Sequence, residues 1–295
     1  MNYAQLRDAY FDVALTHDQD WRLRVGLSKV PYSFENLQSS SKRLSLDRHD
    51  GTNSAVSNER DMGATLFWTP TFARELYKEM SKPGLKGTGD YGLVALGLYN
   101  GQGGNEADLN DALHAVVRVN YPFRAGNKLM EAGISAFVGS YSMISDDLSG
   151  LATVKPSNNY GDSRVALSFV AHPNPIGLQA EYNWGVGPEY NPVTNHIESR
   201  RLKGGYVLLN ASTSINGKPF IPFAVAHHFE GGKKFETDAR SYDVKEVELG
   251  VEWQPIEQFE LTAVYTISSR RFEDAARPIN LQKGRLLRLQ AQMSF

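Results

Sequence analysis

RLLRLQAQMSF, residues 285–295, alternates apolar and polar side chains along an extended chain. The apolar and polar residues would point to opposite faces of one strand, with Leu287, Leu289, Ala291, Met293 and Phe295 against Arg288, Gln290, Gln292 and Ser294. Such strict alternation is typical of a β-strand with one apolar and one polar face. The chain therefore ends in a two-faced strand.

The same period recurs in FELTAVYTI (259–267), EVELGVEW (246–253) and IGLQAEYNW (176–184). In the second of these, Glu248 and Glu252 share the polar face. Two carboxylates would be costly in a dry core, but they cost little when they face water. This pattern favours a sheet with its apolar side toward lipid and its polar side toward a water-filled lumen.

About thirteen strands follow from this reading. Short and long connections alternate along the chain, as in bacterial outer-membrane barrels. AGN (125–127) and NGK (216–218) are short turns, and NGQGGNEADLND (100–111) is a long polar loop. One connection, residues 71–90, stands where a short turn is due and reads as a short helix with a Gly-rich tail. The predicted strands lie near residues 5–16, 21–30, 62–69, 91–100, 113–123, 129–143, 164–172, 176–187, 204–215, 219–229, 245–255, 258–269 and 284–295.

Composition narrows the function classes. The chain has 295 residues, a formal net charge of -2, no cysteine and a mean hydropathy of -0.40. The near-zero charge argues against a nucleic-acid partner. No phosphate-binding loop, G-x-S-x-G or H-E-x-x-H motif is present, and His227 and His228 would point to opposite faces of a strand. We therefore expect no enzyme, no metal site and no cofactor.

The start of the chain carries no basic and apolar export signal. Thirteen alternating strands would also leave the first and last strands parallel, and these two could not close an antiparallel barrel. We therefore expect one barrel domain over residues 1–295 that is incomplete at its N-terminus, with the export signal and an odd number of strands lost there.

The segment DAYFDVALTHDQDWRLRVGLSKVPYSFENLQSSSKRLSLDR (8–48) resembles the phosphate-selective porin O and P family. Weaker matches follow in the same order: RDMGATL (60–66), LGLYNGQG (96–103), RVNYPF (118–123), LQAEY (178–182) and LRLQAQMSF (287–295). The resemblance implies an antiparallel transmembrane β-barrel of about sixteen strands, with long extracellular loops and one loop folded into the pore. It also implies that the terminal Phe295 is a signal for the barrel-assembly machinery.

Basic residues are the candidates for selectivity. By resemblance, the loop from Pro31 to Asp61 is the one that enters the pore, and its candidate anion ligands are Lys42, Arg43, Arg48 and Arg60. Of these, Lys42 and Arg48 lie at positions similar to basic residues of the family's constriction. Because the loop also carries Glu35, Asp47, Asp50, Glu59 and Asp61, a solvated loop of paired charges is the alternative. Alternation places further candidates on the lumen wall, Arg22, Arg24, Arg118 and Arg288, whose alternative role is pairing with Asp8, Asp12, Glu248 or Glu252.

These observations predict a porin of the bacterial outer membrane that lets small hydrophilic solutes diffuse passively. The resemblance adds ion transport with a preference for anions such as phosphate or polyphosphate, and a homotrimer in contact with outer-membrane lipid. An occluded barrel with a structural or adhesion role is the alternative. A soluble all-β binding protein is a third, although thirteen strands with one polar face each do not supply a dry core.

Overall fold

The computed structural model describes residues 5–293 of the chain. It contains α-helices α1 (Asp50–Asn53) and α2 (Thr71–Met80) and four 3₁₀ turns, Ser40–Lys42, Ser57–Glu59, Ser145–Asp147 and Thr237–Ala239. The strands are β1 (Ala9–Ala14), β2 (Trp21–Lys29), β3 (Arg60–Trp68), β4 (Val94–Tyr99), β5 (His114–Ala125), β6 (Lys128–Ser142), β7 (Asn159–Ala171), β8 (Ile176–Asn191), β9 (His196–Ala211), β10 (Thr213–Ile215), β11 (Lys218–Gly232), β12 (Ser241–Ile256), β13 (Phe259–Glu273) and β14 (Leu281–Met293).

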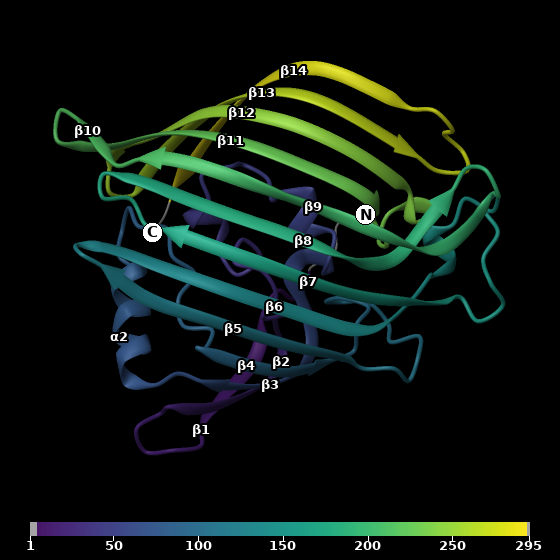
Figure 1. Cartoon of the computed structure of the whole chain (residues 1–295), viewed down its shortest axis with the longest axis horizontal. Helices are drawn as coiled ribbons and strands as arrows, with labels where there is room; N and C mark the ends of the chain where they lie inside the picture. Colours follow the sequence, from purple (N-terminus) through teal and green to yellow (C-terminus); the bar gives the residue numbers. More distant parts are fainter. Residues whose placement is uncertain (1–4, 294–295) are drawn as a thin grey trace.

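All the strands belong to one antiparallel sheet, in which each strand pairs with its neighbours in the sequence except that β9 pairs with β11 and not with β10. The strands follow one another from β1 at the bottom of Figure 1 to β14 at the top. Within the described residues β1 and β14 pair with only one strand each, so the sheet is not closed. The thirteen predicted strands are all present, and the count of thirteen is corrected to fourteen by the short strand β10. The sequence predicts one strand over residues 204–215, but β10 is separate from β9 and pairs only with β11.

The outward face of the sheet is apolar and exposed. Leu249 on β12 is 54% exposed and Leu289 on β14 is 76% exposed, whereas Glu252 on β12 is fully buried on the opposite face. An exposed apolar face of this extent is unfavourable in water and matches the hydrocarbon of a bilayer. The alternation in the sequence thus predicts the faces of these side chains on β12 and β14.

The two ends of the sheet differ, as the loop lengths predict. At the short-turn end, Asn216 and Gly217 both have positive φ, 51° and 72°, which is the conformation that a two-residue hairpin turn needs. Trp21 and Trp68 lie opposite each other near this end and their rings stack at 6.2 Å. The other end, the long-loop end, carries the longer connections.

Helix α2 lies at the short-turn end, in the connection between β3 and β4 (Figure 1). Its apolar side chains Ala73, Tyr77 and Met80 pack against Leu93 and Leu129. The Tyr77 hydroxyl donates a hydrogen bond to the Asn120 carbonyl on β5, at 2.6 Å. Within residues 5–293, no helix has the length and apolar character needed to cross a membrane.

Residues 30–59, which we call the inner segment, connect β2 to β3 and lie against the inner face of the sheet. Residues 30–38 of this segment are all buried. Tyr32 packs in one apolar cluster with Tyr99, Val116 and Phe137 from β4, β5 and β6. The main apolar core therefore lies between the sheet and the inner segment.

Candidate functional site: a cationic cavity beside the inner segment

Hydrogen bonds to β6 and β8 hold the inner segment against the inner face of the sheet, which we call the wall. The Tyr32 hydroxyl donates to the Asn183 side chain, and the Ser33 N–H donates to the Ser135 hydroxyl at 3.0 Å. All four residues are buried. These bonds fix the point at which the chain turns inward from β2.

A single buried carboxylate on β8 holds the next turn. Glu181 accepts the backbone N–H groups of Phe34 and Glu35 at 2.6 and 2.7 Å, and the Tyr206 hydroxyl at 2.8 Å. Both oxygens of the carboxylate are used, so Glu181 fixes two consecutive backbone groups of the inner segment on β8.

Within the inner segment, Glu35 and His49 form a buried ion pair, with Oε1 and Nδ1 2.8 Å apart. Burial opposes charge on both groups, yet the pairing outweighs it. His49 and the Thr52 hydroxyl hold the pKa of Glu35 below its usual range, and Glu35 holds the pKa of His49 above its usual range. The pair joins the two arms of the segment across the turn.

A second set of ion pairs joins helix α1 to the far wall. Asp50 lies 2.5 Å from Lys233 Nζ, in the connection between β11 and β12, and 3.0 Å from Arg270 on β13. Nearby, Lys234 pairs with Asp162 on β7, and Arg164 donates to the Ser54 hydroxyl at 2.8 Å. The side chains of these residues, other than Arg270, are at most 10% exposed or fully buried, so they fill the space between the inner segment and this part of the sheet.

On its other side, the inner segment borders a cavity of about 690 Å³. The remaining walls come from β2, β3, the residues before β1 and the connection that follows α2. Six of its lining residues are basic and one is acidic: Arg7, Lys29, Lys42, Arg43, Arg48 and Arg60 against Glu59. We call this space the cationic cavity.

Three of these cations have close partners. Arg60 binds both carboxylate oxygens of Asp8, at 3.0 and 2.9 Å. Arg48 pairs with Glu59 at 2.6 Å and donates to the Gln38 carbonyl at 3.0 Å. Lys29 donates to the Gln38 carbonyl too, at 2.7 Å. These side chains hold the inner segment in place while their charge faces the cavity.

Lys42 and Arg43 differ from these three. Among the described residues, neither they nor Arg7 has a carboxylate within ion-pair distance, and Lys42 donates only to the Ser81 carbonyl, at 3.3 Å. Two nitrogens of Arg43, Nε and Nη1, are shielded from solvent and have no hydrogen-bond partner among those residues. A guanidinium group with unused donors can bind an oxyanion through its charge and a charge-assisted hydrogen bond. Arg43 is therefore the strongest candidate anion ligand.

Comparison with known protein families now gives an identification. The family model for "Phosphate-selective porin O and P" matches residues 1–212. The chain belongs to this family. Membership indicates a porin of the bacterial outer membrane, in agreement with the apolar outward face.

Comparison with solved structures supports the fold. The outer membrane channel DcaP of Acinetobacter baumannii superimposes with a TM-score of 0.53 at 14% identity, over 94% of this chain and 72% of that chain. At that identity the likeness shows the fold alone. The copper transporter OprC reaches a TM-score of only 0.35 at 10% identity, over 79% of this chain and 39% of that chain, and carries no weight here. No curated protein sequence matches the chain.

The lumen-wall candidates of this porin share the inner face. Arg22 pairs in register with Phe67, Phe67 with Ala95, and Ala95 with Arg118, and directly opposed residues lie on the same face. Most are paired. Arg24 pairs with Asp12 at 2.7 Å and Arg288 with Glu248 at 3.0 Å, two of the carboxylates that the alternative names. Arg22 pairs with Asp90 at 2.9 Å, and Arg288 also with Asp47, two carboxylates that it does not name. Arg118 donates instead to the Gly92 carbonyl at 3.1 Å.

Some site residues escaped sequence analysis. Lys29 was missed because alternation from Arg22 and Arg24 assigns it to the outer face, whereas β2 ends there and the amine reaches the carbonyls of the inner segment. Glu181 appeared in the sequence only as one polar residue of an alternating strand. The terminal Phe295, expected to be an assembly signal, lies outside the described residues.

Proposed function

We propose that this porin is a passive diffusion channel for small hydrophilic solutes and that it favours anions, phosphate-like anions among them. The observation that carries the proposal is the cationic cavity, in which six basic residues face one acidic residue. A passive pore needs a narrow passage and a charge that favours one class of ion, and it needs no catalytic group. The function is transport without chemistry.

The two classes of cation in the cavity have different roles. The paired residues Lys29, Arg48 and Arg60 position the inner segment. Lys42 and Arg43 keep charge or donors available for a solute. A cavity lined with one sign of charge concentrates counter-ions. With Arg7, three cations that are unpaired among the described residues line the cavity. They are few enough for an anion to bind and leave again, as conduction requires.

The test is single-channel recording of the full-length protein in a planar bilayer. Open-channel steps, a reversal potential in a KCl gradient that shows anion preference, and block by added phosphate would support the proposal. Steps without ion preference would leave a general porin. A reversal potential that shows cation preference would contradict the anion assignment.

An occluded barrel with a structural or adhesion role is the second candidate. It is favoured by the buried pairs Asp162–Lys234 and Asp50–Lys233, which fill much of the space inside the sheet. The same recording separates the two functions. A correctly folded protein that gives no current at any voltage would support the occluded barrel and rule out the channel.

The remaining parts of the proposal rest on the family. We propose a closed barrel of about sixteen strands, of which residues 1–295 form one domain, assembled by the barrel-assembly machinery into a homotrimer. Altered gel migration on heating would report a closed barrel, and the mass of the detergent complex would report the trimer. Migration that heating does not change would contradict the closed barrel.

A further inference from the structure

Residues 81–90, which follow α2 and precede β4, form a second segment that reaches across the sheet; we call it the mouth segment. Lys86 Nζ lies 2.7 and 2.6 Å from the two carboxylate oxygens of Glu252 on β12 and 3.8 Å from Glu260 on β13. The Glu252 side chain is fully buried and that of Lys86 is 10% exposed. A segment that leaves the sheet at β3 is thus tied to the opposite part of the sheet.

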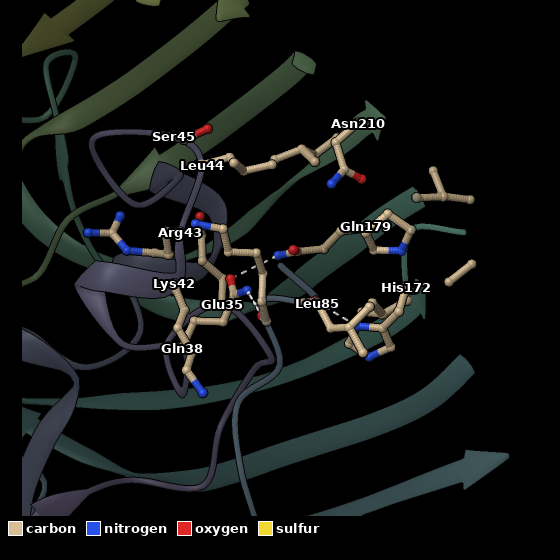
Figure 2. Close-up of a pocket in the computed structure, with 16 residues that line it drawn as sticks. Glu35, Gln38, Lys42, Arg43, Leu44, Ser45, Leu85, His172, Gln179 and Asn210 are labelled. Atoms are coloured by element: carbon tan, nitrogen blue, oxygen red, sulfur yellow. Dashed lines mark hydrogen bonds between the residues drawn. The ribbon is translucent and has the colours of Figure 1, made fainter. Parts of the chain in front are cut away.

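The mouth segment also binds the inner segment. Gln38 donates its side-chain amide to the Lys86 carbonyl at 2.6 Å, and accepts at its amide oxygen from Gln179 on β8 at 3.2 Å. His172, in the turn between β7 and β8, donates from Nδ1 to the Leu85 carbonyl at 2.8 Å. Figure 2 shows Leu85 beside His172, and Gln179 reaching from the wall toward the inner segment. Gln38 therefore bridges the wall and both segments.

The two segments enter from opposite ends of one strand. The inner segment ends where β3 begins, at Arg60, and the mouth segment follows α2, which begins shortly after β3 ends at Trp68. They meet at the cationic cavity, because Thr88 of the mouth segment lines it together with Lys42 and Arg43. A solute in the cavity consequently contacts both segments.

We propose that the mouth segment is a second constriction of this channel, and that Lys86 is the positioning residue that holds it across the lumen by binding Glu252 and Glu260. The proposal rests on the channel function stated above. Lys86 has two effects that can be separated. It fixes the width of the passage by fastening the segment, and it neutralises carboxylates that would otherwise attract cations next to an anion-favouring cavity.

The first experiment separates width from charge with Lys86→Met and Glu252→Gln, each recorded in the full-length protein at about 1 M and about 0.1 M salt. At about 1 M salt the screening length is only about 3 Å, so conductance reports width. We expect both variants to raise the high-salt conductance about twofold. At low salt, Lys86→Met alone should shift selectivity toward cations, because it leaves two carboxylates unpaired.

Lys82→Met is the matched control, since Lys82 lies on the same segment and is exposed. It should conduct like the unaltered protein. High-salt conductance that stays unchanged in both Lys86→Met and Glu252→Gln would overturn the proposal. The two substitutions remove opposite charges, so a common increase reports release of the segment and not a change of charge.

The second experiment tests contact with the solute path through a milder substitution, Thr88→Cys. Residues 1–295 contain no cysteine, so a small negatively charged thiol reagent, which the cationic cavity attracts, reacts only at the introduced site. We expect the reagent to cut the current of Thr88→Cys by at least half and to leave Lys82→Cys unchanged. A current that persists in Thr88→Cys would overturn the inference while the channel function stands, whereas absence of current in the unaltered protein would overturn both.

Discussion

Arg43 and Arg48 line the same cavity, but their guanidinium groups differ in their hydrogen-bond and ion-pair partners. Arg48 is neutralised by Glu59 and bonded to the backbone of the inner segment. Arg43 keeps two nitrogens without a partner among the described residues. Substitution at the first position should therefore affect stability, and substitution at the second should affect ion binding.

We expect Arg43→Gln to weaken phosphate block about tenfold, because about 1.4 kcal/mol of binding is lost with one charge-assisted hydrogen bond. The thermal unfolding midpoint should stay unchanged. Phosphate titration of the single-channel current and a thermal melt measure the two effects. Arg48→Gln is the matched comparison and should show the reverse, a lower midpoint with a smaller change in phosphate block. Equal effects of the two substitutions on block would contradict this assignment.

Glu181 on β8 accepts hydrogen bonds from two backbone N–H groups of the inner segment. Replacement by Gln turns a carboxylate that accepts two backbone N–H groups and one hydroxyl into an amide with a single acceptor oxygen. We expect a loss of about 1–3 kcal/mol of stability and noisier open-channel currents. Thermal unfolding and current recording test this, with the exposed Glu230→Gln as control. Unchanged noise would mean that the inner segment is held elsewhere.

At this scale the sequence identified the basic residues but not their partners. The resemblance favoured Lys42 and Arg48 among the four cations of the loop, whereas in the structure Arg48 is paired with Glu59 and Arg43 has two nitrogens without a partner among the described residues. What separates them is the position of Asp8 and Glu59, and those contacts depend on how the loop folds back on β1 and β3. Lys29 was lost for a related reason, because alternation stops predicting direction where a strand ends.

The inner segment is an element with two kinds of attachment. Neutral and charge-assisted hydrogen bonds hold its first turn to β6 and β8, while ion pairs of Asp50 hold its helix to the other wall. Between them, the Glu35–His49 pair connects its two arms. Attachment at both ends explains how an irregular stretch of about thirty residues can stay in one conformation inside the sheet.

The buried Glu35–His49 pair should make the inner segment sensitive to pH on both sides. The pKa of Glu35 is lowered, so its stabilising contribution is lost as pH falls through that lowered value. The pKa of His49 is raised, so its contribution is lost as pH rises through that raised value. Open-channel noise recorded over a pH series should therefore pass through a minimum between the two values.

Substitution gives the control for this pH dependence. His49→Asn cannot be protonated, so its noise should no longer show the alkaline rise. Glu35→Gln should likewise lose the acidic rise. Noise that varies in the same way with pH in both variants and in the unaltered protein would show that another group is responsible.

Elements with a simple period could be predicted and elements defined by tertiary contact could not. The thirteen long strands follow from alternation, because the apolar and polar faces meet different surroundings. Residues 71–90 were recognised as an interruption with a short helix, which α2 confirms. The course of the mouth segment was not predictable, because it depends on Lys86 meeting Glu252, a residue 166 positions away in the sequence.

The polarity of the two faces of the sheet is the reverse of that in a soluble sheet protein. Its outward face exposes large aliphatic and aromatic side chains, including Leu249, Tyr182 and Trp184, while carboxylates and guanidinium groups fill the inward face. In water such a surface would drive aggregation. The arrangement is stable when lipid covers the outside and water or ion pairs occupy the inside, which excludes the soluble alternative on physical grounds.

Depth in the bilayer gives the most direct test of this arrangement. We expect Leu249→Arg, on the outward face of β12, to destabilise the folded protein by about 2–4 kcal/mol in lipid vesicles, as an arginine near the bilayer midplane does. Asp243→Arg is the matched control on the same strand, close to the long-loop end, where the cost should be about 0–1 kcal/mol.

Denaturant titration in vesicles measures both values. The two positions share a strand and an outward direction but differ in depth. The difference between their two losses of stability therefore reports contact with the hydrocarbon of the bilayer. Equal costs at Leu249 and Asp243 would mean that the apolar face of β12 does not meet lipid. A larger cost at Leu249 would place the centre of the bilayer about that residue, so that the cationic cavity and the mouth segment could be located within the membrane.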